Sequence, residues 1–128
     1  MNTHVILIEP DVIQAELYTA ALEQEGWTIA HVTTAQAAIH AADEQLPAAV
    51  VLELQLSGHS GVEFLYEFRS YSEWLDVPII LHTFVPPHEL AYGATLQKEL
   101  GVRRILYKPT TTLAALCEAV RHVTPAHV

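Results

Sequence analysis

Two short apolar segments of this sequence each end in a single charged residue. Residues 50–52 are followed by Glu53, and residues 105–107 are followed by Lys108. Buried strands of an open α/β sheet often place a single charged side chain at the carboxyl end in this way. The sequence therefore predicts a carboxylate and an ammonium group that face one crevice at the edge of a sheet.

Three further side chains are expected at the same edge. Glu9 follows a strand predicted at residues 5–8. His82 and Thr83 follow a strand predicted at residues 77–81. Carboxylates bind hard divalent cations, whereas lysine and hydroxyl groups bind phosphoryl oxygens. The combination indicates a site for a phosphate group and a divalent cation.

Two hydrophobic periods alternate along the chain and predict strands and helices in turn. The expected strands are residues 5–8, 27–30, 48–54, 77–81 and 102–107, and the expected helices are residues 12–25, 35–44, 61–70, 86–99 and 110–123. This alternation with short links predicts a parallel sheet that helices cover on both faces. Five strands fit a flavodoxin-like, doubly wound α/β fold with three α/β/α layers and strand order 2-1-3-4-5.

Several helix ends carry local signals. The capping-box spacing occurs at Asp11 with Gln14, Thr33 with Gln36, and Ser60 with Glu63. The first helix has its apolar positions at Ile13, Leu17, Ala20 and Ala21, and ends before Gly26; Pro125 follows the last helix. In the link at residues 71–76, Tyr71 and Trp74 either pack under the loop or contact a partner.

Size and composition favour one globular domain over residues 1–128, without an output domain. Hydrophobic residues make up 51% of the 128 residues and charged residues 16%, which is ample for a packed core. No apolar run approaches the roughly 20 residues of a membrane span, and no cationic signal-peptide region opens the chain. The expected location is the cytoplasm.

The charge balance disfavours two classes of partner. With 15 acidic and 6 basic residues the formal net charge is −9, which argues against binding to nucleic acid or to an anionic membrane surface. Cys117 is the only cysteine and lies among apolar residues, so a buried structural thiol is expected. The eight histidines show no metal-ligand spacing, although His59 and His82 are expected near the crevice.

An ordered set of segments resembles the receiver domain of two-component response regulators. The set consists of residues 6–11 (ILIEPD), 25–27 (EGW), 47–54 (PAAVVLEL), 56–61 (LSGHSG), 77–83 (VPIILHT) and 101–109 (GVRRILYKP). The resemblance covers essentially the whole chain. It implies a histidine kinase or a downstream signalling protein as partner, and phosphoryl transfer to an aspartate with the help of Mg²⁺.

The family's functional positions carry over residue by residue. Glu9 matches the first acidic position, Pro10 falls on the second, Glu53 falls on the phosphoryl-accepting aspartate, Thr83 and Lys108 match the two phosphate-binding positions, and Ile105 falls on the aromatic switch position. Three of these positions therefore depart from the family's pattern: Pro10, Glu53 and Ile105.

The departures affect the chemistry directly. Pro10 has no side-chain oxygen for a cation, and Glu53 extends its carboxylate by one methylene, about 1.5 Å. A misplacement of about 1 Å can cost on the order of a hundredfold in rate, and loss of the cation removes the main charge stabilisation. We therefore expect a pseudo-receiver that acts by protein–protein contact, that is not an enzyme, and that has no cofactor.

Several roles stay open at this point. Glu53 is expected to pair with Lys108, and a separation wider than a hydrogen bond plus one water would count against that pairing. Glu9 is either a residual Mg²⁺ ligand or a solvated edge carboxylate. Thr83 either takes part in the site or satisfies loop backbone, and Asp11 is expected to cap a helix rather than bind metal.

Two other functions compete with the pseudo-receiver. One is a phosphorylation-competent response regulator that uses an altered site. The other is a flavodoxin-like protein that binds flavin or another small molecule, but no Gly-rich or Ser/Thr-rich phosphate loop follows the first strand. The family resemblance also implies a dimer contact through the fourth helix, fifth strand and fifth helix, and this face is either such a homodimer interface or an ordinary solvated face; its charged residues are Glu89, Lys98, Arg103, Arg104, Glu118 and Arg121.

Overall fold

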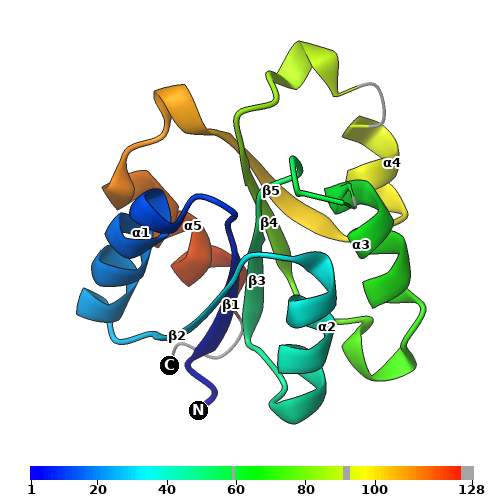
Figure 1. Ribbon diagram of the computed structural model, residues 1–128, viewed down its shortest axis with the longest axis horizontal. Coiled ribbons are helices and arrows are strands. Elements are labelled where there is room, and N and C mark those ends of the chain that lie inside the picture. The colour runs from blue at the N-terminus through cyan, green and yellow to red at the C-terminus, as the bar shows by residue number, and fades with distance from the viewer. Residues whose placement is uncertain (59, 91–92, 125–128) are drawn as a thin grey trace.

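The computed structural model describes residues 1–58, 60–90 and 93–124 (Figure 1). Its regular elements are β1 (His4–Ile8), α1 (Val12–Gln24), β2 (Thr28–Val32), α2 (Ala35–Glu44), β3 (Ala49–Leu52), α3 (Gly61–Arg69), β4 (Ile79–Thr83), α4 (Gly93–Lys98), β5 (Val102–Tyr107) and α5 (Leu113–Val123). Short 3-10 helices lie at Ser72–Trp74, Pro87–Glu89 and Lys108–Thr110.

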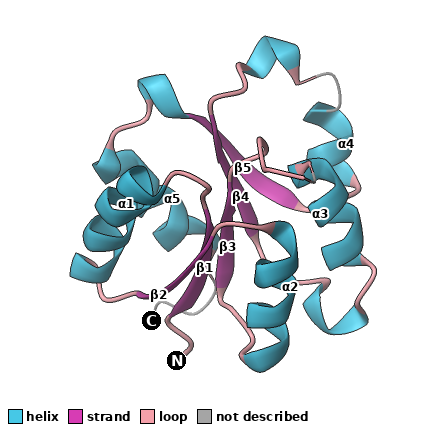
Figure 2. Ribbon diagram, in the orientation of Figure 1, coloured by secondary structure: helices cyan, strands magenta, loops and turns pink. Residues whose placement is uncertain are grey.

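The five strands form one parallel sheet in the order β2-β1-β3-β4-β5. Helices α1 and α5 cover one face of the sheet, and α2, α3 and α4 cover the other (Figure 2). The flavodoxin-like fold predicted from the sequence is confirmed, including its strand order and its three layers. Because all five strands run in the same direction, their carboxyl ends share one edge, the upper edge in Figure 1.

Burial on both faces explains why the central strands are apolar at nearly every position. Every residue of β1, β3 and β4 is buried. One core cluster lies under α2, α3 and α4 and includes the stacked rings of Phe64, Phe68 and Trp74. The second lies under α1 and α5 and includes Leu22 and the predicted buried thiol of Cys117. Trp74 therefore packs under the loop, one of the two alternatives left open by the sequence, whereas Tyr71 is 39% exposed.

A close backbone approach fixes the start of α3 beside the segment that follows β3. The Gly61 amide donates to Leu54 O at 2.8 Å, and a Cβ atom on Gly61 would lie 2.6 Å from Leu54 Cα. Ser60 and Glu63 form the predicted capping box, with both hydrogen bonds at 3.1 Å. The contact requires glycine at position 61, and it holds the loop that carries Glu53 against α3.

Most strand boundaries differ from the sequence prediction by one or two residues. β2 runs on to Val32, and β3 ends at Leu52 rather than at residue 54, although the Glu53 amide still donates to Ile8 O at 3.0 Å. β4 begins at Ile79, two residues later than predicted, because the Val77 amide donates to Trp74 O and closes the preceding turn.

Helix boundaries also differ. The helix predicted at residues 86–99 is two pieces, a 3-10 turn at Pro87–Glu89 and α4, because Leu90 leaves the helical region with φ −82° and ψ 81°. Part of that prediction, residues 91–92, lies outside the described residues, as does Pro125. α5 starts at Leu113, where Thr112 accepts a hydrogen bond from the Ala115 amide. Thr34, and not Thr33, caps α2 by accepting from the Ala37 amide.

Helix α1 presents its apolar residues differently from the prediction. Its fully buried residues are Ala15 and Leu22, whereas Ile13 and Leu17 are 75% and 57% exposed and Ala20 is also exposed. The apolar spacing predicted the helix correctly but not the side that packs on the sheet. Among the described residues, no helix is long and apolar enough to span a membrane.

Candidate functional site

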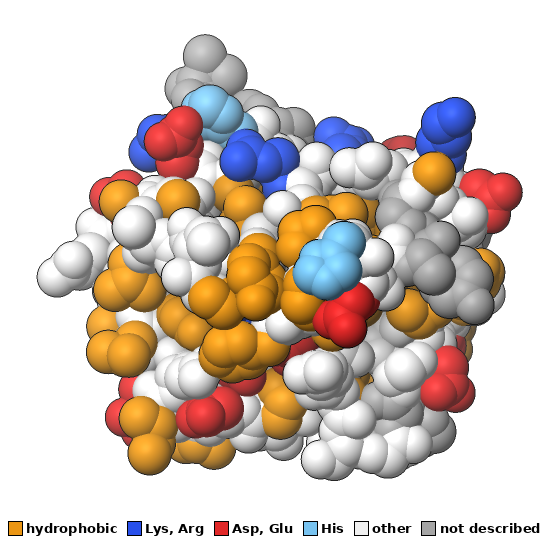
Figure 3. Space-filling model, turned by 90° about the horizontal axis from the view of Figure 1, so that it is seen from above, with side chains coloured by type: hydrophobic (Ala, Val, Ile, Leu, Met, Phe, Trp, Pro, Cys, Tyr) orange, Lys and Arg blue, Asp and Glu red, His pale blue; other side chains and the backbone are white. Residues whose placement is uncertain are grey.

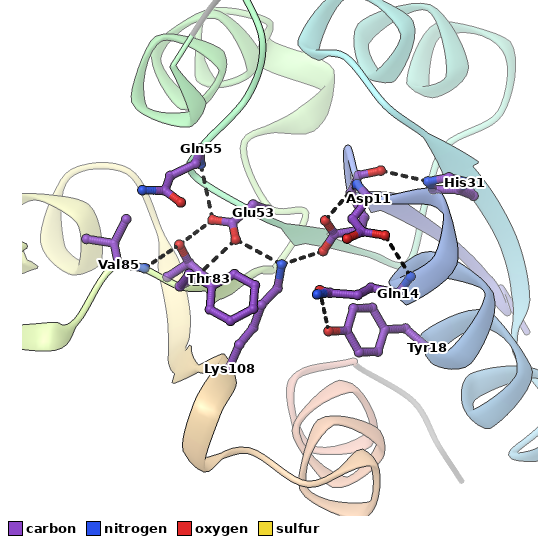
Figure 4. A network of polar contacts seen from close by, with 11 residues as sticks. Asp11, Gln14, Tyr18, His31, Glu53, Gln55, Thr83, Val85 and Lys108 are labelled. Carbon is purple, nitrogen blue, oxygen red and sulfur yellow. Dashed lines mark hydrogen bonds and ion pairs between the residues drawn. The ribbon is translucent and has the colours of Figure 1, made fainter.

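Four side chains predicted at the carboxyl edge meet there, and Figure 4 labels three of them, Glu53, Thr83 and Lys108. Glu9 directly follows β1, Glu53 follows β3, Thr83 ends β4, and Lys108 follows β5. All four are buried, with exposed fractions between 0% for Thr83 and 8% for Lys108. The sheet topology therefore unites residues that are up to 99 positions apart in the sequence.

The Lys108 ammonium group joins the two carboxylates. Its Nζ atom lies 2.9 Å from Glu53 Oε1 and 2.6 Å from Glu9 Oε1. The predicted pairing of Glu53 with Lys108 is confirmed, whereas the contact with Glu9 was not predicted. The three side chains together carry a formal charge of −1 in a buried position, so each carboxylate depends on the same cation.

Glu53 accepts hydrogen bonds on both oxygens. Oε1 accepts from Lys108 and from the Phe84 amide at 3.1 Å, and Oε2 accepts from the Thr83 hydroxyl and from the Gln55 amide at 3.1 Å. Four donors thus converge on one carboxylate. Burying a charge in this way requires such donors, and here the chain supplies every one of them.

Glu9 is also fully engaged. Oε1 binds Lys108, and Oε2 accepts from the Asp11 amide at 3.1 Å. His31 Nε2 donates to the Glu9 carbonyl at 2.8 Å and holds the β1 end in place. Glu9 is 2% exposed, which excludes the solvated edge carboxylate, one of the two roles left open for it. Asp11 caps α1 as predicted, accepting from the Gln14 amide at 3.1 Å.

Thr83 combines the two roles that the sequence left open. Its hydroxyl donates to Glu53 and accepts from the Val85 amide at 3.1 Å, so it belongs to the site and also satisfies loop backbone. Aromatic rings lie beside the ammonium group: Lys108 Nζ is 4.7 Å from the centre of the Phe84 ring and 5.9 Å from that of Tyr18. These rings add a favourable cation–π contribution.

The protonation states follow from these contacts. Burial alone would raise the pKa of Glu53, but hydrogen bonds from Thr83, Lys108 and the Gln55 amide outweigh it and lower the pKa below its usual value. Burial alone would lower the pKa of Lys108, yet Glu9 and Glu53 raise it. Both partners of the ion pair are therefore charged at neutral pH.

His82 is neutral at neutral pH. Burial, and then the charge of Lys108, lower its pKa to about 4. The imidazole is 3% exposed and packs edge-on against Tyr18, with ring centres 4.7 Å apart. His82 thus lies beside the site, as predicted, and the pairing of a neutral ring with Tyr18 is a packing contact. His59, predicted near the same crevice, lies outside the described residues.

The residues present do not fit a Mg²⁺ ion. Pro10 offers no side-chain oxygen, each oxygen of Glu9 and Glu53 already accepts at least one hydrogen bond, and the Lys108 ammonium lies within bonding distance of both carboxylates. A divalent cation bound to both would face that positive charge at short range. Among the described residues, no three His, Cys, Asp or Glu side chains are grouped to hold a metal ion.

The remaining predicted positions border this network. Pro10 is half-buried and lines the pocket above it, together with Glu9, Asp11, Gln14, Glu53, Gln55, Phe84 and Lys108. Ile105 is half-buried and packs against the core cluster under α2, α3 and α4. It does not join the polar contacts.

Sequence reasoning missed three contributors. The amides of Gln55 and Phe84 are backbone donors that any residue type supplies, so no sequence signal marks them. The His31 contact to Glu9 depends on the pairing of β1 with β2, which places Ile8 opposite Val32. A sequence pattern indicates that strands are adjacent, but it does not reveal which side chain reaches a neighbouring carbonyl.

Comparison with known proteins agrees with the family resemblance found in the sequence. The family model described as "Response regulator receiver domain" matches residues 5–121. The probable transcriptional regulatory protein TcrX of Mycobacterium tuberculosis is 35% identical over 79 residues, which are 62% of this chain but only 33% of that protein. The chain therefore matches about a third of the length of this curated relative.

Solved structures share the fold. A sensor protein from Polaromonas is 21% identical with a TM-score of 0.84, and the match covers 96% of each chain. The receiver domain of a sensor histidine kinase from Pseudomonas aeruginosa, with magnesium coordinated in its active-site cleft, is 20% identical with a TM-score of 0.80, covering 95% of this chain and 97% of that one.

Proposed function

This chain belongs to the response regulator receiver family of two-component signalling, and we propose that it is a pseudo-receiver within that family. In this proposal it transmits a signal by binding a protein partner, either a histidine kinase or a downstream signalling protein. It does so in the cytoplasm, without phosphorylation at Glu53, without Mg²⁺ and without enzymatic activity of its own.

One observation supports this proposal above the others: the Lys108 ammonium group binds both Glu9 and Glu53 in a buried network. An acceptor carboxylate must present a free oxygen in line with the incoming phosphorus, and alignment errors of about 1 Å are costly. Both oxygens of Glu53 are instead directed at donors within the chain. With Pro10 at the second acidic position, the charge compensation that phosphoryl transfer needs is also missing.

The partner surface that we propose is the outer side of α1. Ile13 and Leu17, one helical turn apart, are both exposed, and Val12 is 54% exposed beside them. Viewed from above, hydrophobic side chains gather over the side on which α1 lies and continue toward the middle of the face, with most charged groups at the margins (Figure 3). Such an apolar patch rimmed by polar groups is typical of a protein-binding surface.

Introduction of a charge into the apolar patch tests this surface. Leu17→Glu leaves the buried face of α1 unchanged, so the fold should persist while binding of a cognate kinase or downstream protein weakens at least tenfold. Glu16→Ala, on the next exposed position, is the matched control and should bind normally. Equal binding by the wild type and by Leu17→Glu would rule out α1 as the contact.

A homodimer through α4, β5 and α5 is a separate part of the proposal. Four charged side chains of mixed sign are exposed on it, Lys98, Arg103, Arg104 and Glu118, which suits a self-complementary contact; Glu89, predicted in the fourth helix, lies in the 3-10 turn before α4. Arg121, expected in the same set, lies 3.7 Å from Glu25 and is directed toward α1 instead. Sedimentation of the wild type and of Arg104→Glu would test the homodimer. A wild type that is monomeric at all concentrations would refute it.

The test of the pseudo-receiver itself is incubation with a small phosphodonor and MgCl₂, followed by intact-mass measurement. The wild type should keep its unmodified mass. A stoichiometric phosphoryl adduct that disappears in Glu53→Ala would overturn the proposal. That outcome would support the alternative, a phosphorylation-competent response regulator that uses an altered site.

A further inference from the structure

We propose that a pocket between α2, α3 and the link after α3 binds a guanidinium group of the kind that arginine carries. The pocket has a volume of about 370 Å³, and its lining includes Gln36, Ile39 and Asp43 of α2, Glu67 of α3, and Tyr71 and Trp74 of the link. It lies on the face of the sheet opposite to α1 (Figure 2) and shares no residue with the pocket above Lys108. The inference goes beyond the proposed function and does not depend on it.

Tyr71 provides an aromatic wall that the core holds in place. Trp74 is buried and stacks on Phe68, with ring centres 4.9 Å apart. The Tyr71 ring packs against Trp74, with ring centres 4.7 Å apart, yet it remains exposed. Arg69 donates to the Trp74 carbonyl at 2.6 Å and fixes the link. An exposed aromatic ring that is fixed in this way is suited to bind a cation.

Two carboxylates without a cationic partner lie beside this wall. Asp43 and Glu67 belong to different helices, and neither forms a salt bridge with a residue that the structure describes. The ring of His40 lies in the same lining, but its Nε2 atom is 2.9 Å from Glu44 Oε1. None of the described residues that line the pocket is Lys or Arg. The formal net charge of −9 adds a long-range attraction for cations.

The chemistry of the lining favours a flat organic cation over a metal ion. Among the described residues, no three His, Cys, Asp or Glu side chains are grouped to hold a metal, so His40, Asp43 and Glu67 do not form a metal site. A guanidinium group has five N–H donors in one plane, so it can bind carboxylates on two helices while its face stacks on a ring. An ammonium group concentrates its donors at one point and has no face to stack.

The experiment records ¹H–¹⁵N spectra of the full chain during titration with N-acetyl-L-arginine methylamide, which mimics an arginine residue of a protein, at constant ionic strength. The amides of Gln36, Glu67 and Tyr71 should shift in a saturable manner. A dissociation constant on the order of 1 mM is expected, because contacts of exposed groups are individually weak. The indole signal of Trp27, which lies in the core under α1 and α5, should not move. The corresponding lysine derivative should bind about fivefold more weakly.

Substitutions in the lining test each contribution. Asp43→Asn and Glu67→Gln, both at exposed positions, should each weaken binding about threefold, and the double variant about tenfold. Tyr71→Leu removes the ring and should weaken binding about fivefold. Glu73→Gln is the matched control, because it removes the same charge from an exposed position of the link that does not line the pocket. It should bind the arginine derivative as the wild type does.

Three outcomes would overturn the inference. They are no saturable shift of the pocket amides, equal binding of the lysine derivative, and wild-type affinity in the Asp43→Asn/Glu67→Gln double variant. Free L-arginine distinguishes the source of the guanidinium group. Tighter binding of free arginine than of the capped derivative would indicate a small-molecule ligand, whereas equal or weaker binding would indicate an arginine of a partner protein. Both of these results would support the guanidinium site.

Discussion

Lys108 Nζ lies 2.9 Å from Glu53 Oε1, although 55 residues separate the two in the sequence. The same nitrogen lies 2.6 Å from Glu9 Oε1. The cation that both carboxylates need is therefore part of the chain, and it is held at the point where the carboxyl ends of three strands meet. Stability, ion binding and phosphoryl transfer should all depend on this one ammonium group.

Removal of the ammonium group should be strongly destabilising. Lys108→Met leaves two carboxylates, 2% and 3% exposed, without a cation, and loss of one partner of a buried ion pair typically costs about 3–5 kcal/mol. We expect the free energy of unfolding at pH 7, measured in urea, to fall by that amount. Lys98→Met, at an exposed position on α4, is the control and should change little. A loss below about 1 kcal/mol for Lys108→Met would contradict the account.

The buried imidazole of His82 should make the protein sensitive to mild acid. Its pKa of about 4 lies below the usual 6.5, so between these two pH values the unfolded chain binds a proton that the folded chain does not. Stability should therefore fall as the pH drops from 6.5 toward 4, by about 3 kcal/mol in total. Urea unfolding at several pH values measures the slope.

The variant for this measurement is His82→Phe, compared with the wild type. Phenylalanine at position 82 keeps a ring against Tyr18 and removes the titration, so the slope between pH 6.5 and 4 should decrease. Identical slopes in the wild type and in His82→Phe would show that this histidine does not control the acid response.

Arg69 should be important for the fold at a distance from the site. Its guanidinium donates to the carbonyls of Leu100 at 2.8 Å and Trp74 at 2.6 Å, and also to those of Leu75 and Gly101. These bonds join the end of α3 to the turn before β4 and to the start of β5.

An Arg69→Met substitution should lower the free energy of unfolding by about 3 kcal/mol, because half-buried carbonyls lose charged donors. Arg69→Lys should recover only part of this loss, since an ammonium group cannot reach all four carbonyls. Urea unfolding compares the three proteins. Wild-type stability in Arg69→Met would show that solvent replaces these bonds at no cost.

Much of the fold could be predicted from the sequence because burial on both sides of a parallel sheet makes its strands continuously apolar. The runs before Glu9 and Glu53 predicted β1 and β3, and the same pattern predicted that Lys108 and Glu53 share an edge. The split of the helix predicted at residues 86–99 was not visible, because Leu90 is an ordinary helix former and its backbone angles follow from tertiary contacts.

The inner connectivity of the site was harder to predict. Sequence spacing placed Glu9 at the correct edge, but its contact with Lys108 depends on side-chain length and direction across two strands. The outward position of Ile13 and Leu17 was also hidden, because apolar spacing alone does not distinguish a core face from a binding face. The unpredicted contact of Glu9 and the outward position of Ile13 and Leu17 both concern residues to which we assign functional roles.

Magnesium titration should separate this chain from receivers that bind the ion. Calorimetry of the wild type should show no saturable heat with MgCl₂, because the Lys108 ammonium group already binds both Glu9 and Glu53. A Pro10→Asp/Glu53→Asp variant restores the second acidic residue and shortens the carboxylate, and it should gain saturable Mg²⁺ binding. Saturable binding by the wild type would show that Lys108 can leave the two carboxylates.

The most direct test of the central claim uses the same pair of proteins, treated side by side with a small phosphodonor and MgCl₂ and then analysed by intact mass. We predict an unmodified wild type and a phosphoryl adduct on Pro10→Asp/Glu53→Asp, located at position 53 by peptide mapping. A wild type that becomes phosphorylated at Glu53 to the same extent as the double variant would contradict the claim that this site supplies its own cation and anion.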